Sequence, residues 1–571
     1  MADIIIEKNV PVPMRDGVTL RADVYRQSRS ARDPVLLERT PYSKVLPRMV
    51  LDTIHVLNAV EAGYAVVIQD TRGRFTSDGE FTPFFDDIAD GYDTVEWCAA
   101  QSWSSGRVGM FGTSYVGATQ LLAAIAAPPH LAAICPVVTA GDFHNGWIYE
   151  GGALRLGFVA SWAAQFLSLA QLERLPLSPQ QRDSERQRIL DEVGRLRRAL
   201  SHLPLKELPL FRLEGLAPYF QDWLAHPGDD DYWRRCNIIA HHERVTVPAL
   251  HMGGWYDLFV AGALRNFAGL RKNAATPSAR AGQRLLFGPW VHGSLQSQTT
   301  VAGERDFGWR SLIPLSQTKL TWFDHWLKDI DNGVASEAPA RIYVMNHGWR
   351  HEQEWPLEST EFTRFYLHSA GRANSLGGDG RLSRDTPGSQ PPDVFLYNPL
   401  NPAPTVGVEG IHDQRAVEAR SDVLVYSTAP LTEALEVTGP VTVVLHASSS
   451  APDTDFAAKL VDVAPNGYAA NLCDGMIRAR YRNSGAHPEL MQPGEAYQFT
   501  IDLNGTGNLF LPGHQIRLEI SSSNFPKFDR NLNTGEPVAL EHHPRPAMQT
   551  VFHDSKYPSY VLLPVIPRKG T

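Results

Sequence analysis

Short apolar runs alternate with segments of helical periodicity along the first 140 residues. A polar–apolar alternation on both sides of Arg15-Asp16-Gly17 predicts an N-terminal hairpin with a glycine turn. Helical patterns lie at 49–62 and around 90–97. Nearly continuous apolar runs, typical of strands buried on both faces, lie at 34–39, 64–70, 108–113 and 131–138. Strands and helices that alternate in this way predict a mostly parallel α/β sheet.

Between residues 144 and 242 the buried-strand pattern stops and helical patterns replace it, notably at 153–170 and 178–201. The second of these segments is densely charged, which is typical of a solvated helix face. Buried-strand patterns return at 246–252 and 284–288. We therefore expect a helical insertion in an α/β core.

Beyond about residue 346 the helical patterns give way to short strand patterns separated by turns rich in Gly, Pro, Asn and Asp. This spacing predicts a sandwich or jelly roll of about 220 residues. The predicted strands are 361–367, 393–397, 423–426, 437–447, 455–463, 476–482, 497–503 and 515–521. The expected domains are an α/β core, a helical cap and a C-terminal jelly roll, at 1–143 with 243–350, at 144–242 and at 351–571.

Residues 108–117 have the pattern of an apolar strand, a turn around Ser114 and the start of a helix. This is the layout of a nucleophile elbow, in which the serine hydroxyl projects from the top of a sheet. Gly112 and Gly117 are expected where a side chain would collide with a neighbouring strand or helix. In the common pattern G-x-S-x-G a second glycine stands where this chain has Val116. A serine that only caps a helix gives a similar pattern, so the rest of the chain has to supply a base and an acid.

Two later loops carry candidates for that base and acid. Asp257 follows the predicted strand 246–252, and His292 follows the predicted strand 284–288. The carboxyl ends of parallel strands gather at one edge of the sheet. Ser114 comes before both, which gives the Ser–Asp–His order of α/β hydrolases. A serine hydroxyl is a poor nucleophile at neutral pH, so an imidazole has to take its proton and a carboxylate has to orient the imidazole.

The negatively charged intermediate of such a reaction also needs preorganised hydrogen-bond donors. The backbone N–H of Tyr115, directly after the serine, is one predicted donor. The second is expected from the loop after the strand 34–39, where Pro41 has no N–H but the Tyr42 hydroxyl can donate.

Other charged clusters have simpler interpretations. Asp70, Arg72 and Arg74 are predicted to brace strand-end loops rather than to react. Asp86-Asp87 lacks the spacing of a calcium loop and is interpreted as a solvated turn. We expect no metal site and no cofactor.

Composition narrows the class of protein. A chain of 571 residues with 43% hydrophobic and 20% charged residues is expected to form several globular domains. Its net charge of -9 argues against a nucleic acid or an anionic membrane as the main partner. The four cysteines form no C-x-x-C pair. We find no pattern of a signal peptide or membrane span, and a cytoplasmic location is expected.

Several segments resemble the CocE/NonD (X-Pro dipeptidyl-peptidase S15-like) hydrolases, a family that includes cocaine esterases, α-amino-acid ester hydrolases and glutaryl acylases. The similar segments are 39–42, 69–73, 112–117, 253–257, 288–292, 453–456 and 521–526. The resemblance covers nearly the whole chain and is closest to the bacterial cocaine esterases in length and segment order. The elbow of this family is Gly-x-Ser-Tyr-x-Gly, with which Val116 and Gly117 agree.

The resemblance implies a role for each candidate. Ser114 is the implied nucleophile, His292 the base and Asp257 its orienting acid, while Tyr42 and the amide of Tyr115 form the oxyanion hole. It also implies an α/β-hydrolase core, an inserted helical cap and a C-terminal jelly roll.

The acyl pocket of such an enzyme is expected between core and cap. The resemblance places Trp147, Trp162 and Phe259 in its wall. Aromatic residues at helical spacing are also common in protein cores, so both interpretations of these three residues stay open.

The expected function is hydrolysis of small carboxylic esters with an aromatic or hydrophobic acyl group, through a serine acyl-enzyme. One alternative is an amide or peptide hydrolase on the same fold: an acylase, an α-amino-acid ester hydrolase or an X-Pro dipeptidyl-peptidase. A remoter one is a non-catalytic binding protein whose C-terminal domain binds carbohydrate. The C-terminal domain is expected to wall the active-site cleft or to help form a homodimer.

Overall fold

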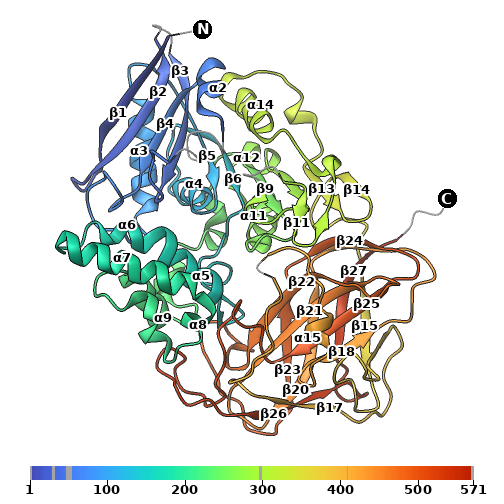
Figure 1. Cartoon of the computed structure of the whole chain (residues 1–571). Coiled ribbons are helices and arrows are strands. Elements are labelled where there is room, and N and C mark those ends of the chain that lie inside the picture. Colours follow the sequence, from blue (N-terminus) through green and yellow to red (C-terminus); the bar gives the residue numbers. More distant parts are fainter. Residues whose placement is uncertain (1–2, 29–31, 47–53, 295–298, 408, 568–571) are drawn as a thin grey trace.

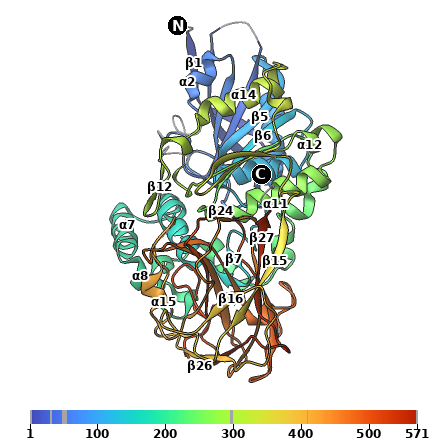
Figure 2. The ribbon, with the colours of Figure 1, turned by 90° about the vertical axis from the view of Figure 1, so that its right-hand side faces the viewer.

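The computed structural model describes residues 3–28, 32–46, 54–294, 299–407 and 409–567. An α/β core occupies one end of the molecule and an all-β domain the other, with a helical insertion beside both (Figure 1). The view turned by 90° shows the same arrangement, with the core above the all-β domain (Figure 2). The predicted fold class is confirmed.

The core contains a mixed sheet with ten strands among the described residues, in the order β1-β2-β4-β3-β5-β6-β9-β10-β13-β14. Neighbouring strands are parallel from β4 to β13. The predicted hairpin forms one edge, where β1 (Ile4–Pro13) and β2 (Thr19–Gln27) pair antiparallel. The other strands are β3 (Asp33–Thr40), β4 (Ala65–Asp70), β5 (Ser104–Thr113), β6 (Leu131–Val137), β9 (Leu250–Gly254), β10 (Arg284–Gly288), β13 (Ala340–Val344) and β14 (Gly348–Glu352).

Helices cover both faces of this sheet. Successive side chains of a strand point to opposite faces, so neighbouring residues pack against different helices. Leu37 of β3 packs with α3 (Asp87–Ala99) and α4 (Tyr115–Ile125) on one face. Leu36 packs on the other face with α2 and α14. Those two helices span Val56–Glu61 and Leu315–Lys328. The first part of the predicted helix 49–62, residues 49–53, lies outside the described residues.

The insertion joins β6 to β9 and is mostly helical. Its predicted helix 153–170 begins later, because β8 (Ala153–Leu154) pairs with β7 (Tyr149–Glu150) in a short hairpin. The chain becomes helical at Leu156 and stays so to Leu172 through a π-helical turn. The helices are α5 (Leu156–Trp162), α6 (Leu169–Leu172), α7 (Pro179–Gly194), α8 (Leu196–Leu200), α9 (Pro218–Ala225) and α10 (Asp231–Arg234).

Thirteen strands of the C-terminal half join in one hydrogen-bonded sheet among the described residues. The prediction of one strand at 437–447 was wrong, because the chain changes strand partners at Gly439-Pro440 and forms β19 and β20. The predicted strand 476–482 is the end of β22, which is followed by a helical turn. The strands are β15 (Glu361–His368), β16 (Arg381–Ser383), β17 (Asp393–Tyr397), β18 (Leu424–Ser427), β19 (Leu435–Gly439), β20 (Thr442–Ser449), β21 (Asp455–Val463), β22 (Ala469–Arg478), β23 (Tyr497–Asp502), β24 (Thr506–Phe510), β25 (Gln515–Ser521), β26 (Ala547–Phe552) and β27 (Tyr560–Ile566).

The insertion is fastened to the all-β domain at the β7–β8 hairpin. Arg478 N–H donates to the Gly151 carbonyl at 2.8 Å, and Leu154 N–H donates to Asp529 Oδ1 at 2.7 Å. The Arg478 guanidinium lies 3.0 Å from the same Asp529 carboxylate and 2.8 Å from that of Asp455. These charges are buried, and removing one partner of such a group leaves another buried charge unpaired.

Among the described residues, no helix has both the length and the apolar character needed to cross a membrane.

Candidate active site

Ser114 lies in the sharp turn between β5 and α4. Its backbone has φ 64° and ψ -123°, and such strained conformations cost on the order of 1–3 kcal/mol for a non-glycine residue. Hydrogen bonds hold the turn: Ser114 N–H donates to the Val137 carbonyl at 2.9 Å, and Gly117 N–H donates to the Ser114 carbonyl at 2.8 Å. This is the strand–turn–helix geometry of a nucleophile elbow.

The two glycines of this turn are required by close packing. A Cβ atom on Gly112 would lie 2.1 Å from Val116 Cγ1, and Gly112 has φ 138°. A Cβ atom on Gly117 would lie 3.0 Å from both the Val137 carbonyl oxygen and Thr139 Cβ. The glycine three residues after Ser114 therefore lets the helix pack closely on the end of β6.

Asp257 and His292 form a hydrogen-bonded pair that lines the same cavity as Ser114. They follow the adjacent parallel strands β9 and β10, and His292 Nδ1 lies 2.7 Å from Asp257 Oδ2. The other carboxylate oxygen, Oδ1, accepts the Phe259 N–H at 2.6 Å. The Asp257 side chain is 1% exposed and that of His292 is 23% exposed. Because an ionised carboxylate can only accept, Nδ1 is the donor, and Nε2 is then the nitrogen that can take a proton.

The charges around His292 favour its protonated form. Burial alone would lower the pKa of His292, but the carboxylates of Asp257 and Glu409 outweigh burial and raise it. Glu409 comes from the C-terminal domain, and its Oε2 accepts the His292 backbone N–H at 3.0 Å. Burial raises the pKa of Glu409, while the adjacent His292 opposes that rise.

One predicted oxyanion donor, the Tyr115 N–H, directly follows Ser114, and the other, Tyr42, lines the same cavity as Ser114. Tyr42 follows β3, and its hydroxyl oxygen accepts the indole N–H of Trp162 at 2.9 Å. An indole N–H can only donate, so this bond does not use the hydroxyl proton of Tyr42. Tyr42 and Ser114 line the same cavity, and Tyr115 begins α4.

The charged residues of the neighbouring loops act as braces, as predicted. Arg74 is buried and donates to the Pro41 carbonyl at 2.9 Å and to the Leu167 carbonyl at 3.0 Å. It therefore ties the loop of Tyr42 to the insertion. Asp70 accepts the Lys44 backbone N–H at 2.8 Å and holds the far end of that loop.

The interpretation of Asp86-Asp87 as a solvated turn was wrong for Asp87. This side chain is buried, accepts the Tyr115 hydroxyl at 2.7 Å and lies 3.1 Å from Arg39. The Phe84 N–H in turn donates to the Tyr115 hydroxyl oxygen at 2.8 Å. The hydroxyl of Tyr115 is thus fixed by two hydrogen bonds. They restrain the whole residue, including the backbone N–H that is the predicted oxyanion donor.

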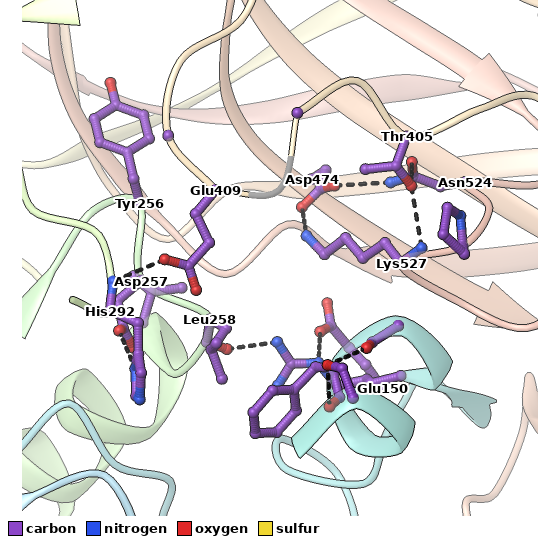
Figure 3. Close-up of a pocket in the computed structure, with 18 of the residues that line it drawn as sticks. Glu150, Tyr256, Asp257, Leu258, His292, Thr405, Glu409, Asp474, Asn524 and Lys527 are labelled. Atoms are coloured by element: carbon purple, nitrogen blue, oxygen red, sulfur yellow. Dashed lines mark hydrogen bonds and ion pairs between the residues drawn. The ribbon is translucent and has the colours of Figure 1, made fainter. Parts of the chain in front are cut away.

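A cavity of about 560 Å³ opens over Ser114 and His292, between the core, the insertion and the C-terminal domain. The insertion supplies a mostly apolar wall, including Phe158, Trp162, Phe166, Leu196 and Leu200. The C-terminal domain supplies polar side chains, including Thr405, Asn471, Asp474, Asn504, Asn524 and Lys527. Figure 3 shows Asp474, Asn524 and Lys527 across the pocket from His292.

The three aromatic residues expected in the acyl pocket have different surroundings. Trp162 lines the cavity, but the cavity lining includes neither Trp147 nor Phe259. These two pack on each other with ring centroids 4.3 Å apart, and Phe259 lies against the His292 ring at 5.4 Å. They form a buried layer behind the pocket, so their direct role in binding stays a prediction.

Sequence reasoning missed the residues that the C-terminal domain contributes. Glu409, Asp474 and Lys527 lie in segments without a motif, and only the packing of this domain onto the core brings them to the cavity. Lys527 Nζ lies 2.5 Å from Asp474 Oδ1.

Comparison with known proteins agrees with this architecture. Residues 16–294 match the X-Pro dipeptidyl-peptidase (S15) family, and residues 332–562 match the X-Pro dipeptidyl-peptidase C-terminal non-catalytic domain. Cocaine esterase from Rhodococcus sp. (strain MB1 Bresler) is 40% identical over 582 residues, which cover 99% of each chain.

Two solved structures also cover nearly the whole chain. An aminopeptidase from the marine sediment archaeon Thaumarchaeota archaeon is 26% identical with a TM-score of 0.80 and covers 99% of this chain and 97% of its own. An α-amino acid ester hydrolase is 25% identical with a TM-score of 0.79 and the same coverage. The chain belongs to the CocE/NonD branch of the X-Pro dipeptidyl-peptidase (S15) family of serine hydrolases.

Proposed function

We propose that the protein is a serine esterase that cleaves small carboxylic esters with an aromatic or hydrophobic acyl group. The observation that carries this proposal is one shared cavity: the Ser114 turn and the hydrogen-bonded Asp257–His292 pair line it, under an apolar wall of the insertion. The relation to cocaine esterase supports an ester as the substrate class.

In the proposed mechanism the Ser114 hydroxyl attacks the ester carbonyl while His292 Nε2 takes its proton. Asp257 keeps the ring in the required orientation and stabilises the imidazolium. The oxyanion accepts hydrogen bonds from the Tyr42 hydroxyl and the Tyr115 N–H. The bond to the alcohol then breaks, and His292 returns the proton to the departing oxygen.

The acyl-enzyme is then hydrolysed by the reverse sequence. Water gives a proton to His292 and attacks the acyl carbonyl, and the bond to Ser114 breaks as the serine oxygen regains its proton. Trp162 and its apolar neighbours offer a wall for the acyl group, while the polar wall of the C-terminal domain remains for the alcohol.

Matched substrates test this assignment. A fluorophosphonate probe is expected to label Ser114, and a benzoate ester is expected to be cleaved much faster than the corresponding benzamide, because an amide needs stronger protonation of its leaving group. Adding a free α-amine to the acyl group is expected to bring no gain in kcat/KM. Equal or faster cleavage of the amide would contradict the proposal, and a chain that the probe does not label would favour a binding protein.

A second candidate is a hydrolase of aminoacyl esters or amides. It is favoured by the carboxylates of Glu150, Glu409 and Asp474, which line the cavity and could receive an ammonium group. Two of them already have cationic partners, since Asp474 pairs with Lys527 and Glu150 lies 3.6 Å from Arg155. A large gain in kcat/KM from a free α-amine in the same substrate series would establish this candidate.

The proposed oxyanion hole makes its own prediction. Tyr42→Phe is expected to lower kcat by about 100- to 1,000-fold, with KM changing much less, because its hydroxyl acts on the transition state. Tyr232→Phe, which removes a hydroxyl from the insertion outside the cavity, serves as the matched control. Loss of the Trp162 contact is monitored by the thermal midpoint. A Tyr42→Phe enzyme with unchanged kcat would exclude the hydroxyl as a donor.

A further inference from the structure

The C-terminal domain reaches directly into the proposed catalytic group. Figure 3 shows Glu409 above His292, with a hydrogen bond to its backbone N–H, and Asp257 bound to its ring. His292 therefore contacts two carboxylates: Asp257 holds its ring at Nδ1, and Glu409 holds its backbone N–H at 3.0 Å.

The loop that carries Glu409 is fixed from both domains. Ile411 N–H donates to the Ala302 carbonyl at 3.2 Å, and Glu304 N–H donates to the Ile411 carbonyl at 2.7 Å, so the loop is joined to the core by an isolated β-bridge. A Cβ atom on Gly410 would lie 2.3 Å from the Gly303 nitrogen. The approach of loop and core is therefore close enough to require glycine.

The all-β domain holds the same loop from its other side. Asn471 of β22 accepts the His412 N–H at 2.7 Å and donates to the Gly410 carbonyl at 3.1 Å. His412 Nε2 also lies 2.9 Å from the Glu409 carbonyl oxygen. These bonds place the Glu409 side chain at a defined position rather than leaving it on a free loop.

The charged groups that face His292 come from three parts of the chain. They are Asp257 from the core, Glu409 from the C-terminal domain and Arg155 from the insertion. Arg155 opposes the carboxylates, but it donates to the Gly146 and Leu258 carbonyls at 2.5 and 2.7 Å. Asp257 belongs to the core and to the predicted catalytic residues. Glu409 belongs to neither group.

We propose that Glu409 is a positioning residue that stabilises the imidazolium of His292 during catalysis and fixes the backbone of the loop that carries His292. The inference rests on the proposed esterase function, in which His292 becomes positively charged as it takes the serine proton. A carboxylate held against the backbone N–H of His292 favours the charged form of the ring in a partly buried site. The C-terminal domain then contributes to the chemistry as well as to the wall of the pocket.

The pH dependence of kcat/KM tests this role. His292 must be neutral to act as a base, so activity is lost as the pH falls through its pKa. Removing the negative charge of Glu409 lowers the pKa of His292, and Glu409→Gln is therefore expected to move the acidic limb of the profile to lower pH. The amide oxygen can still accept the His292 N–H. The plateau is expected to fall by about tenfold, in kcat rather than in KM.

Two further variants separate this effect from a loss of structure. Glu409→Ala removes both charge and hydrogen bond, and it should show the same displaced limb with a lower plateau. Asp306→Asn removes an exposed carboxylate of the core, which accepts the Gly308 N–H instead, and its limb should match that of the unaltered enzyme.

An unmoved limb in Glu409→Gln, or an equal movement in Asp306→Asn, would overturn the inference. These outcomes are interpreted only if the unaltered enzyme hydrolyses esters. Each rate is divided by the number of active sites that the probe labels. If the unaltered enzyme cleaves no ester, it is the proposed function that fails.

Discussion

Replacing Ser114 with alanine is expected to lower kcat/KM for an aromatic ester by about 10⁴- to 10⁶-fold, because the reaction then loses its nucleophile. The fold should survive, since the backbone of Ser114 is held by Val137 and Gly117 and not by its hydroxyl. Alanine keeps a Cβ atom and adds no bulk to the turn. Initial rates on a benzoate ester, measured with fluorophosphonate labelling, check the expectation.

Ser105→Ala is the matched control, because Ser105 lies exposed near the opposite end of the same strand, β5. Its rate and labelling should equal those of the unaltered enzyme. If Ser114→Ala retained full ester hydrolysis, the entire assignment of the site would have to be abandoned.

Asp257→Asn is expected to lower kcat by about 10⁴-fold at neutral pH. The side chain keeps its size but loses the charge that holds the Nδ1–H tautomer of His292, and the asparagine amide can donate to Nδ1 instead. The remaining activity should have its acidic limb at lower pH, since one of the two carboxylates that raise the pKa of His292 is gone.

Asp306→Asn, which removes an exposed carboxylate of the core, controls for the loss of one surface charge. Circular dichroism and the thermal midpoint report whether the Asp257 variant is folded. A folded Asp257→Asn enzyme with nearly normal kcat would show that the pair with His292 is structural only.

The two substitutions at His292 partners should differ in kind. Asp257 determines which nitrogen of the His292 ring is basic, so its loss is expected to remove nearly all of kcat. Glu409 acts from the backbone side through its charge, so its loss changes the rate modestly and moves the pH profile. Comparing the two profiles under the same conditions separates orientation of the ring from stabilisation of its charge.

Strands whose ends are marked by nearby turn residues could be predicted from the sequence. The strands 393–397, 455–463 and 515–521 were predicted with their observed bounds, because turn residues flank each apolar or alternating run. The segment 437–447 divides into two strands at Gly439-Pro440, a dipeptide typical of turns, where the pairing passes from β24 to β23. The burial of Asp87 was missed because its partners Arg39 and Tyr115 are distant in sequence.

The candidate site divides in the same way. Ser114, Asp257 and His292 could be chosen because each follows a recognisable strand, and parallel strands bring such loops to one edge. The cavity walls could not be predicted, because they depend on how the insertion and the C-terminal domain pack against that edge. Trp147 and Phe259 illustrate the limit, as aromatic residues near the site that lie one layer behind the cavity.

The hairpin of β7 and β8 has a consequence for recombining these domains. It belongs to the insertion by sequence, yet its backbone is bound to Arg478 and Asp529 of the all-β domain, and the helix that follows carries Trp162. A chimera that takes only the C-terminal half of a relative would therefore have to rebuild these hydrogen bonds. If it does not, we expect the apolar wall that contains Trp162 to shift. The hairpin therefore has to be exchanged together with the segments of Arg478, which binds it through a backbone N–H, and of Asp529, which binds it through its carboxylate.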